Sequence, residues 1–215
     1  MKTIPAVNCK NFECVKKSVA ELSGFLPKGS WVQIDVSDGK FTRVKSWNNP
    51  KELKAWLKKE KIKKFNYEIH LMVRDSVKEA KKWLSFGANR IIFHVEGLTE
   101  KQYEFFMKLP ASKTGFSAAP ETDIKEASLF LNCFNFIQLL AVAPGYSGRK
   151  FNRAVLGKIK FIKKHYPGAV IEIDGGMNPQ TAKLAKKAGA GIIVAGSYVF
   201  NGKNPEKSYE NLRAV

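Results

Sequence analysis

The feature that most constrains the fold of this chain is the alternation of short β-rich runs with longer segments of helical periodicity. A strand, a helix and a second strand in this order form a parallel βαβ unit. Eight such runs predict a sheet closed into a single (β/α)8 barrel over residues 1–215, with an open doubly wound sheet as the alternative. The expected strands lie near residues 3–8, 31–36, 66–72, 90–95, 113–118, 136–142, 169–174 and 191–195.

Two repeated junctions support this assignment. The segment from Ser76 to Phe86 has apolar residues at helical spacing and lysines on its other face, and Gly87 follows it. Gly189 stands in the same position before another β-rich run. Because glycine adopts the left-handed conformation that ends many helices, each glycine predicts a turn from a helix into a strand.

The length of 215 residues suits one domain of this class. No window approaches the roughly 18 apolar residues of a membrane span, so no membrane partner is expected. The first apolar run ends at Asn8, too early for a signal-peptide core, and we therefore expect a cytoplasmic protein.

The net charge of +18 suggests a nucleic-acid partner at first sight. The lysines are dispersed over helix-like segments, which is typical of solvated helix faces, so nucleic acid is not favoured. The three cysteines, Cys9, Cys14 and Cys133, form no C-x-x-C pair and no metal-ligand spacing. We expect reduced thiols. The sequence leaves a homo-oligomer open.

Polar residues stand at the expected carboxyl ends of three strands, where barrels of this class place their functional groups. Period-2 alternation puts Gln33, Asp35 and Ser37 on one face, His70 shares a face with Met72, and Asp174 ends the seventh run. Asp35, His70 and Asp174 would share a cation or a reaction if they converge at the barrel mouth. The alternative is that each residue caps a neighbouring loop. For His70 the capping role and the functional role are equally favoured, but for Asp174 we favour a functional role.

Glycines follow the last strands. Gly175 and Gly176 come after the seventh run, Gly196 and Ser197 end the eighth, and the loop 144–150 after the sixth contains Gly148. Bare backbone N–H groups at this place often bind phosphate in such barrels. Three consecutive glycine-containing loops therefore indicate a phosphate site, and the loop 144–150 has the flexibility to close over a ligand.

In this order the motifs resemble those of the ribulose-phosphate 3-epimerase family, from Pro5 to Arg213. The resemblance implies a divalent-metal enzyme of the ribulose-phosphate-binding type of barrel that interconverts D-ribulose 5-phosphate and D-xylulose 5-phosphate. The similar stretches are Asp35 to Gly39, His70 to Val73, Phe93 to Glu96, Pro144-Gly145 with Gly148 and Phe151, Ile171 to Asn178, and Val194 to Ser197 with Phe200.

By that resemblance, Asp35 and Asp174 are the two acid/base groups, one on each face of the substrate. They also bind the metal together with His70. One base removes the proton next to the ketone and the other supplies a proton from the opposite side, while the metal stabilises the enediolate. The phosphate would lie on the residues Gly148, Gly175, Gly176, Gly196 and Ser197.

The chain departs from the family pattern at the site. Gln33 stands where the family has its first metal-ligand histidine, so it is a doubtful ligand. Cys9, Ser37, Met72 and Leu140 would line the substrate pocket, three of them as replacements; Ala143 and Ser147 are further replacements. An amide oxygen is a poorer ligand than imidazole for zinc or iron. The cofactor is thus expected to be zinc, iron, manganese or magnesium, weakly bound or absent as purified.

Several functions remain open from the sequence. The first is epimerisation of a pentulose 5-phosphate or of a related hexulose 6-phosphate. Another sugar-phosphate reaction on the same scaffold, such as an aldol-type synthase, would use the same enediolate. A catalytically silent phospholigand-binding protein is the third interpretation. The presence of both carboxylates favours an enzyme.

Overall fold

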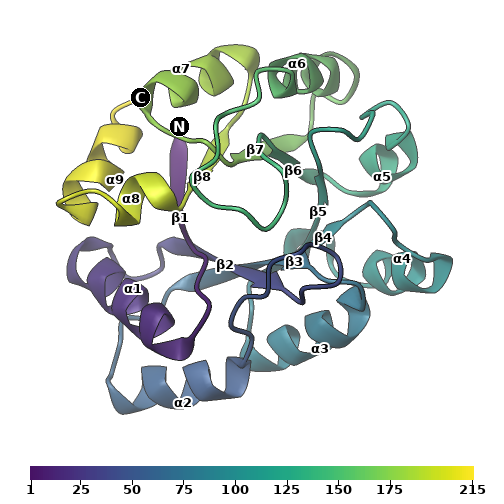
Figure 1. Ribbon diagram of the computed structural model, residues 1–215. Coiled ribbons are helices and arrows are strands. Elements are labelled where there is room, and N and C mark those ends of the chain that lie inside the picture. Colours follow the sequence, from purple (N-terminus) through teal and green to yellow (C-terminus); the bar gives the residue numbers. More distant parts are fainter.

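Eight parallel strands form the centre of the molecule and alternate with helices along the whole chain (Figure 1). The computed structural model describes residues 1–215. All eight expected strands are present, with bounds that differ by a few residues at most. They are β1 (Lys2–Val7), β2 (Trp31–Ser37), β3 (Asn66–Met72), β4 (Arg90–His94), β5 (Thr114–Ala118), β6 (Phe136–Leu140), β7 (Val170–Asp174) and β8 (Ile192–Ala195).

The helices surround the strands. Several begin at side-chain caps: Asn11, Asn49, Asp75 and Asn178 each accept a backbone N–H of the first turn. None of the helices combines the length and the apolar character that a membrane span requires. They are α1 (Phe12–Phe25), α2 (Pro50–Lys59), α3 (Ser76–Phe86), α4 (Glu100–Met107), the 3-10 turn η1 (Ala111–Lys113), α5 (Ser128–Cys133), α6 (Val155–His165), α7 (Pro179–Ala188), α8 (Ser197–Phe200) and α9 (Pro205–Arg213).

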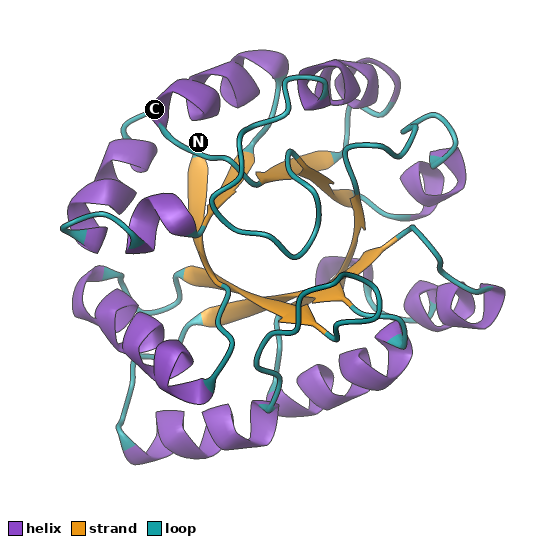
Figure 2. Cartoon of the chain, in the orientation of Figure 1, coloured by secondary structure: helices purple, strands orange, loops and turns teal.

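The sheet closes on itself, as the ring of strands in Figure 2 shows. Each strand pairs with the next in the chain, and β8 returns to pair with β1 through Ile4 and Val194, among others. The closed barrel is therefore confirmed and the open sheet is excluded. Gly87 and Gly189 adopt the left-handed conformation, with φ of 107° and 115°, at the ends of α3 and α7.

Strand alternation separates two kinds of core. Side chains that point outward from the strands pack under the helices in a cluster of 44 buried residues. The inward apolar cluster is much smaller, with 6 residues. It shares the barrel interior with fully buried polar side chains, among them Gln33, Glu68, Gln138 and Glu172. Much of the barrel interior is therefore polar. Charged groups such as Glu68 and Glu172 lie inside it, beneath the carboxyl ends of the strands.

Arg90 closes the lower part of this interior. Its guanidinium lies over Phe136 at 3.6 Å and over Trp31 at 4.3 Å, and one of its nitrogens donates to Glu68 at 2.8 Å. Burial raises the pKa of Glu68, and Arg90 acts against that shift. The buried pair is thus stabilised by aromatic faces as well as by charge.

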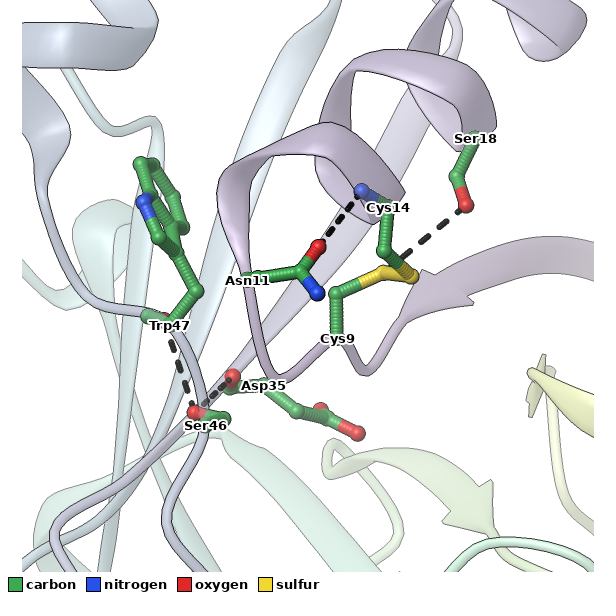
Figure 3. The surroundings of a disulfide bond; sticks show 7 residues. All are labelled: Cys9, Asn11, Cys14, Ser18, Asp35, Ser46 and Trp47. Atoms are coloured by element: carbon green, nitrogen blue, oxygen red, sulfur yellow. Dashed lines mark hydrogen bonds between the residues drawn. A yellow bond between two sulfur atoms is a disulfide. The ribbon is translucent and has the colours of Figure 1, made fainter.

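The expectation of reduced thiols throughout is wrong for two of the three cysteines. Cys9, two residues after β1, and Cys14 in the first turn of α1 form a disulfide, with their Cα atoms 5.7 Å apart (Figure 3). Because only residues 8–11 connect β1 to α1, this short turn brings the two cysteines within disulfide range. Cys133 is free.

Two loops meet above the carboxyl ends of the strands. One, residues 38–49, connects β2 to α2, and Ser46 anchors it by donating to the backbone oxygen of Asp35 at 2.9 Å (Figure 3). The other, residues 141–154, is green in Figure 1 and reaches over the mouth. A Cβ atom on Gly145 would lie only 2.6 Å from Thr42 Oγ1, so the two loops are closely packed.

Candidate active site

Three ionisable side chains from β2, β3 and β7 converge at the mouth. One ligand atom from each of Asp35, His70 and Asp174 lies within 4.8 Å of the others. His70 Nδ1 is 3.4 Å from Asp35 Oδ1 and 3.6 Å from Asp174 Oδ2. Pairing of Asp35 with His70 across β2 and β3 fixes their register. The structure thus brings together the three residues that the strand ends suggested.

A chain of hydrogen bonds approaches His70 from β4 and the segment after it. Glu96 Oε2 lies 2.8 Å from His94 Nδ1, and His94 Nε2 lies 2.9 Å from His70 Nε2. We call Glu96, His94 and His70 the histidine chain. Since an ionised carboxylate only accepts, His94 donates from Nδ1 and accepts at Nε2, and His70 donates from Nε2. His70 Nδ1 faces the two carboxylates and has no hydrogen-bond partner.

The pKa values along the histidine chain follow its contacts. Burial would raise the pKa of Glu96, but the hydrogen bond and charge of His94, with donors from Thr122 and the Ala119 backbone, lower it to about 2. Burial lowers the pKa of His94. For His70, burial is outweighed by Asp35 and Asp174, and its pKa is raised. Position Nδ1 of His70 is suited to a proton or a cation.

A second chain reaches the same carboxylates from inside the barrel. Gln33 Nε2 donates to Asp35 Oδ1 at 2.7 Å and to Asp174 Oδ2 at 2.9 Å. Gln138 Nε2 donates to Gln33 Oε1 at 2.8 Å and to Glu172 Oε1 at 2.9 Å. We call Glu172, Gln138 and Gln33 the glutamine chain. The Gln33 amide therefore presents hydrogens, and not its oxygen, to the carboxylates.

The surroundings of Asp174 disfavour its ionised form. Burial, followed by the negative charge of Asp35, raises the pKa of Asp174 to about 7. Burial and the neighbouring Glu68 likewise raise the pKa of Glu172, deeper in the barrel. Carboxyl groups placed close together in a buried site share protons in this way. Near neutral pH Asp35 and Asp174 can therefore hold one proton between them. One carboxyl group can then act as an acid while the other acts as a base.

The glycine loops line the same cavity as the carboxylates. Gly148, Gly175, Gly176, Gly196 and Ser197 all border it. The backbone N–H groups of Gly175, Gly176 and Gly196 have no acceptor within the chain. A Cβ atom on Gly176 would lie 2.7 Å from the Phe151 backbone, so a side chain has no room there. Free N–H donors on a glycine backbone are suited to a phosphate.

The predicted pocket residues divide into two pairs. Met72 and Leu140 border the cavity. Cys9 and Ser37 do not: Cys9 is bonded to Cys14, and the Ser37 hydroxyl donates to Met72 Sδ at 3.8 Å. Sequence reasoning missed Gln138, because it lies in an apolar strand, and assigned no role to His94 or Glu96. The H-x-E spacing that begins at the last residue of β4 was the available signal for the latter two.

Comparison with known proteins gives a consistent result. Residues 4–200 match the Ribulose-phosphate 3 epimerase family. The ribulose-phosphate 3-epimerase of Schizosaccharomyces pombe is 29% identical over 215 residues, covering 99% of this chain and 92% of that protein. The cytoplasmic isoform from Oryza sativa subsp. japonica is 30% identical over 194 residues, covering 85% of this chain and 81% of that protein.

Solved structures with the same architecture are more distant in sequence. A 3-hexulose-6-phosphate synthase from Salmonella typhimurium has a TM-score of 0.71 at 15% identity, covering 100% of this chain and 97% of that chain. Orotidine 5'-phosphate decarboxylase from Pyrococcus horikoshii has a TM-score of 0.64, also at 15% identity, covering 99% of this chain and 100% of that one. At this identity the likeness shows the fold alone.

Proposed function

The chain belongs to the ribulose-phosphate 3-epimerase family, and we propose that it interconverts D-ribulose 5-phosphate and D-xylulose 5-phosphate with Asp35 and Asp174 as its two bases. The observation that carries this proposal is the pair of carboxylates on β2 and β7, which face one cavity beside the glycine loops. The relatives are named as epimerases, and two carboxylates that converge beside the site of an anionic ligand favour an enzyme over a protein that only binds the ligand.

The proposed reaction moves one proton at carbon 3. One carboxylate takes the proton from carbon 3, and the electron pair shifts to the carbon 2 oxygen to give an enediolate. The other carboxyl group then delivers its proton to the opposite face of carbon 3, which restores the ketone with inverted configuration. The raised pKa of Asp174 supports this scheme, because the pair then holds the one proton that each turnover needs.

The residues present fit a divalent cation through three ligands. Asp35 and Asp174 offer carboxylate oxygens, and His70 offers an Nδ1 atom that has no other partner. When bound, such a cation would offset the negative charge of the enediolate. The histidine chain holds the His70 ring in place for this task. We propose weak binding of zinc, iron, manganese or magnesium, since Gln33 adds no fourth ligand atom in this orientation.

At the other end of the substrate, we propose that the glycine N–H groups hold the phosphate. The hydroxyl of Ser147 lies beside them, 3.7 Å from where a Cβ atom on Gly196 would be, and adds a donor. The loop that carries Gly148 would close over the bound sugar and exclude water. With backbone donors for the phosphate, Asp35 and Asp174 would remain free to act on the sugar.

We also propose that the protein acts in the cytoplasm, as the name of its rice relative says of that protein. A phosphorylated ketose is its expected partner. The homo-oligomer left open by the sequence and the absence of nucleic-acid binding stay predictions.

The test is conversion of D-ribulose 5-phosphate in deuterium oxide, followed by proton NMR. We expect D-xylulose 5-phosphate to form with deuterium at carbon 3. The silent-binder alternative predicts no exchange, although inorganic phosphate would still raise the melting temperature. An aldol-type synthase would instead cleave or form a carbon–carbon bond. No exchange at carbon 3, with or without added manganese, would refute the epimerase proposal.

A further inference from the structure

The Gln33 amide and a bound cation would use the same atoms. Asp35 Oδ1 and Asp174 Oδ2 are the oxygens nearest to His70 Nδ1, at 3.4 and 3.6 Å. They are also the two oxygens that accept from Gln33 Nε2. A cation shared by these oxygens and His70 would therefore lie beside the positively polarised hydrogens of the amide. The amide hydrogens therefore repel the cation and compete with it for the carboxylate oxygens. The strength of this competition depends on the orientation of the amide.

Gln138 fixes this orientation. Both glutamine side chains are fully buried, so water cannot replace a lost hydrogen bond. Gln138 Nε2 faces two acceptors, Gln33 Oε1 and Glu172 Oε1. If the Gln33 amide turned over, it would lose both bonds to the carboxylates, and its nitrogen would face the Gln138 nitrogen. Breaking buried hydrogen bonds without replacement is costly, so the amide is held with its hydrogens outward.

We propose that Gln138 is a positioning residue that sets the divalent-metal affinity of the site through Gln33. By accepting from Gln138, the Gln33 oxygen is withdrawn from the metal position, and the Gln33 nitrogen supplies hydrogen bonds in place of a fourth ligand. The site consequently binds a divalent cation weakly, through three residues. This inference rests on the cation site of the proposed function, but it concerns binding and not turnover.

The primary test measures Mn²⁺ affinity by electron paramagnetic resonance, without substrate. Gln138→Leu removes the donor to Gln33 and keeps the side chain similar in size. The Gln33 oxygen, left without a partner, then becomes free to bind the cation. Partners of metal ligands typically change affinity by about 10- to 100-fold, and we expect the dissociation constant to fall by about 10-fold. Equal or weaker binding than in the wild type would overturn the proposal.

A double-mutant cycle separates this route from a general packing effect. In a Gln33→Leu background, Gln138→Leu should not change the Mn²⁺ affinity further, because the amide through which it acts is gone. A similar gain in that background would contradict the proposal. Ser117→Ala is the matched control: its hydroxyl is also buried in the barrel strands without a partner, and we expect its affinity to equal that of the wild type.

Two further variants keep the test decisive if Gln138→Leu does not fold. Gln138→Met keeps the length of the side chain and should give the same gain. Gln33→Leu alone should bind Mn²⁺ more tightly than the wild type, because it removes the competing hydrogens; unchanged or weaker binding would mean that Gln33 does not oppose the cation. Since none of these measurements uses a sugar phosphate, loss of the epimerase proposal would leave them unaffected.

Discussion

The histidine chain and the glutamine chain have the same number of links, start at a glutamate and reach the same two carboxylates. They differ in what they present there. His70 ends the first chain with a ring nitrogen that can accept a proton or a cation, whereas Gln33 ends the second with hydrogens that can only be donated. The same pair of carboxylates thus contacts a titratable group, the His70 ring, on one side and a fixed dipole, the Gln33 amide, on the other.

The starting glutamates differ in the same sense. Glu96 lies at the mouth among donors, and its pKa is lowered to about 2. Glu172 is sealed in the barrel, where burial and the nearby Glu68 raise its pKa. The environment, and not the residue type, therefore gives one chain a charged origin and favours a neutral origin for the other. Variants along the two chains should differ in how strongly they change turnover and metal binding, with the largest change at the shared carboxylates.

Removing one of the two carboxylates at which both chains end should have the largest effect on turnover. Asp174→Asn or Asp35→Asn replaces a proton carrier by an amide of nearly the same size. General acid–base groups typically contribute about 10²- to 10⁴-fold to the rate, and we expect turnover to fall by that factor. Coupled assays of D-ribulose 5-phosphate conversion measure it, with phosphate-dependent melting as the control for folding. Turnover near the wild-type value in either variant would refute its role as a base.

Ending both chains in an imidazole should have the next largest effect, on metal affinity. Gln33→His replaces the fixed donor by a second imidazole, which offers a good ligand to zinc or iron. We expect the dissociation constant for Zn²⁺ to fall by about 10-fold or more, with a gain in epimerase activity. Metal analysis after dialysis, with turnover on both proteins, checks this. Stoichiometric zinc or iron in the unmodified protein would instead contradict the proposed weak binding and show that a second imidazole is not needed.

Breaking the histidine chain should weaken the site without emptying it. His94→Phe keeps a ring against His70 but removes the acceptor for its Nε2–H. The His70 ring then loses its fixed orientation, and Mn²⁺ affinity should fall by about 10-fold. Isothermal titration measures the change, and Phe116→Leu on β5, which packs outside the barrel, serves as a control. An unchanged affinity would separate His94 from the cation site.

The two starting glutamates should affect stability, and the pH dependence of this effect has opposite signs for them. Because the folded pKa of Glu96 lies below its ordinary 4.5, its ionisation stabilises the protein above pH 4.5, and this contribution is lost as the pH falls towards 2. The cost of Glu96→Gln should therefore grow from pH 3 to pH 6, to on the order of 3 kcal/mol.

For Glu172 the sign is reversed. Its folded pKa is raised, so its contribution is present below pH 4.5 and is lost as the pH rises through the folded value. The cost of Glu172→Gln should thus shrink from pH 3 to pH 6. Urea unfolding of both variants at the two pH values gives the comparison, and parallel pH trends would contradict it.

The local features of the fold could be predicted from the sequence because they depend on short-range rules. Gly87 marked a helix end, and strand alternation placed Gln33 and Asp35 on one face. The disulfide could not be predicted, because whether Cys9 reaches Cys14 depends on how tightly β1 turns into α1. Gln138 lies 105 residues from its partner Gln33, and only closure of the barrel reveals that contact.

The most direct test of the two-base mechanism follows solvent deuterium into each epimer separately. D-ribulose 5-phosphate and D-xylulose 5-phosphate are incubated in deuterium oxide with Asp35→Asn or Asp174→Asn, and the carbon 3 proton is observed by NMR. Since the carboxylates are proposed to act on opposite faces, each variant should exchange that proton in one epimer only, with the preference reversed between the two variants and neither epimer converted. Exchange in both epimers by one variant would show that a single carboxylate reaches both faces, and the two-base account would be wrong.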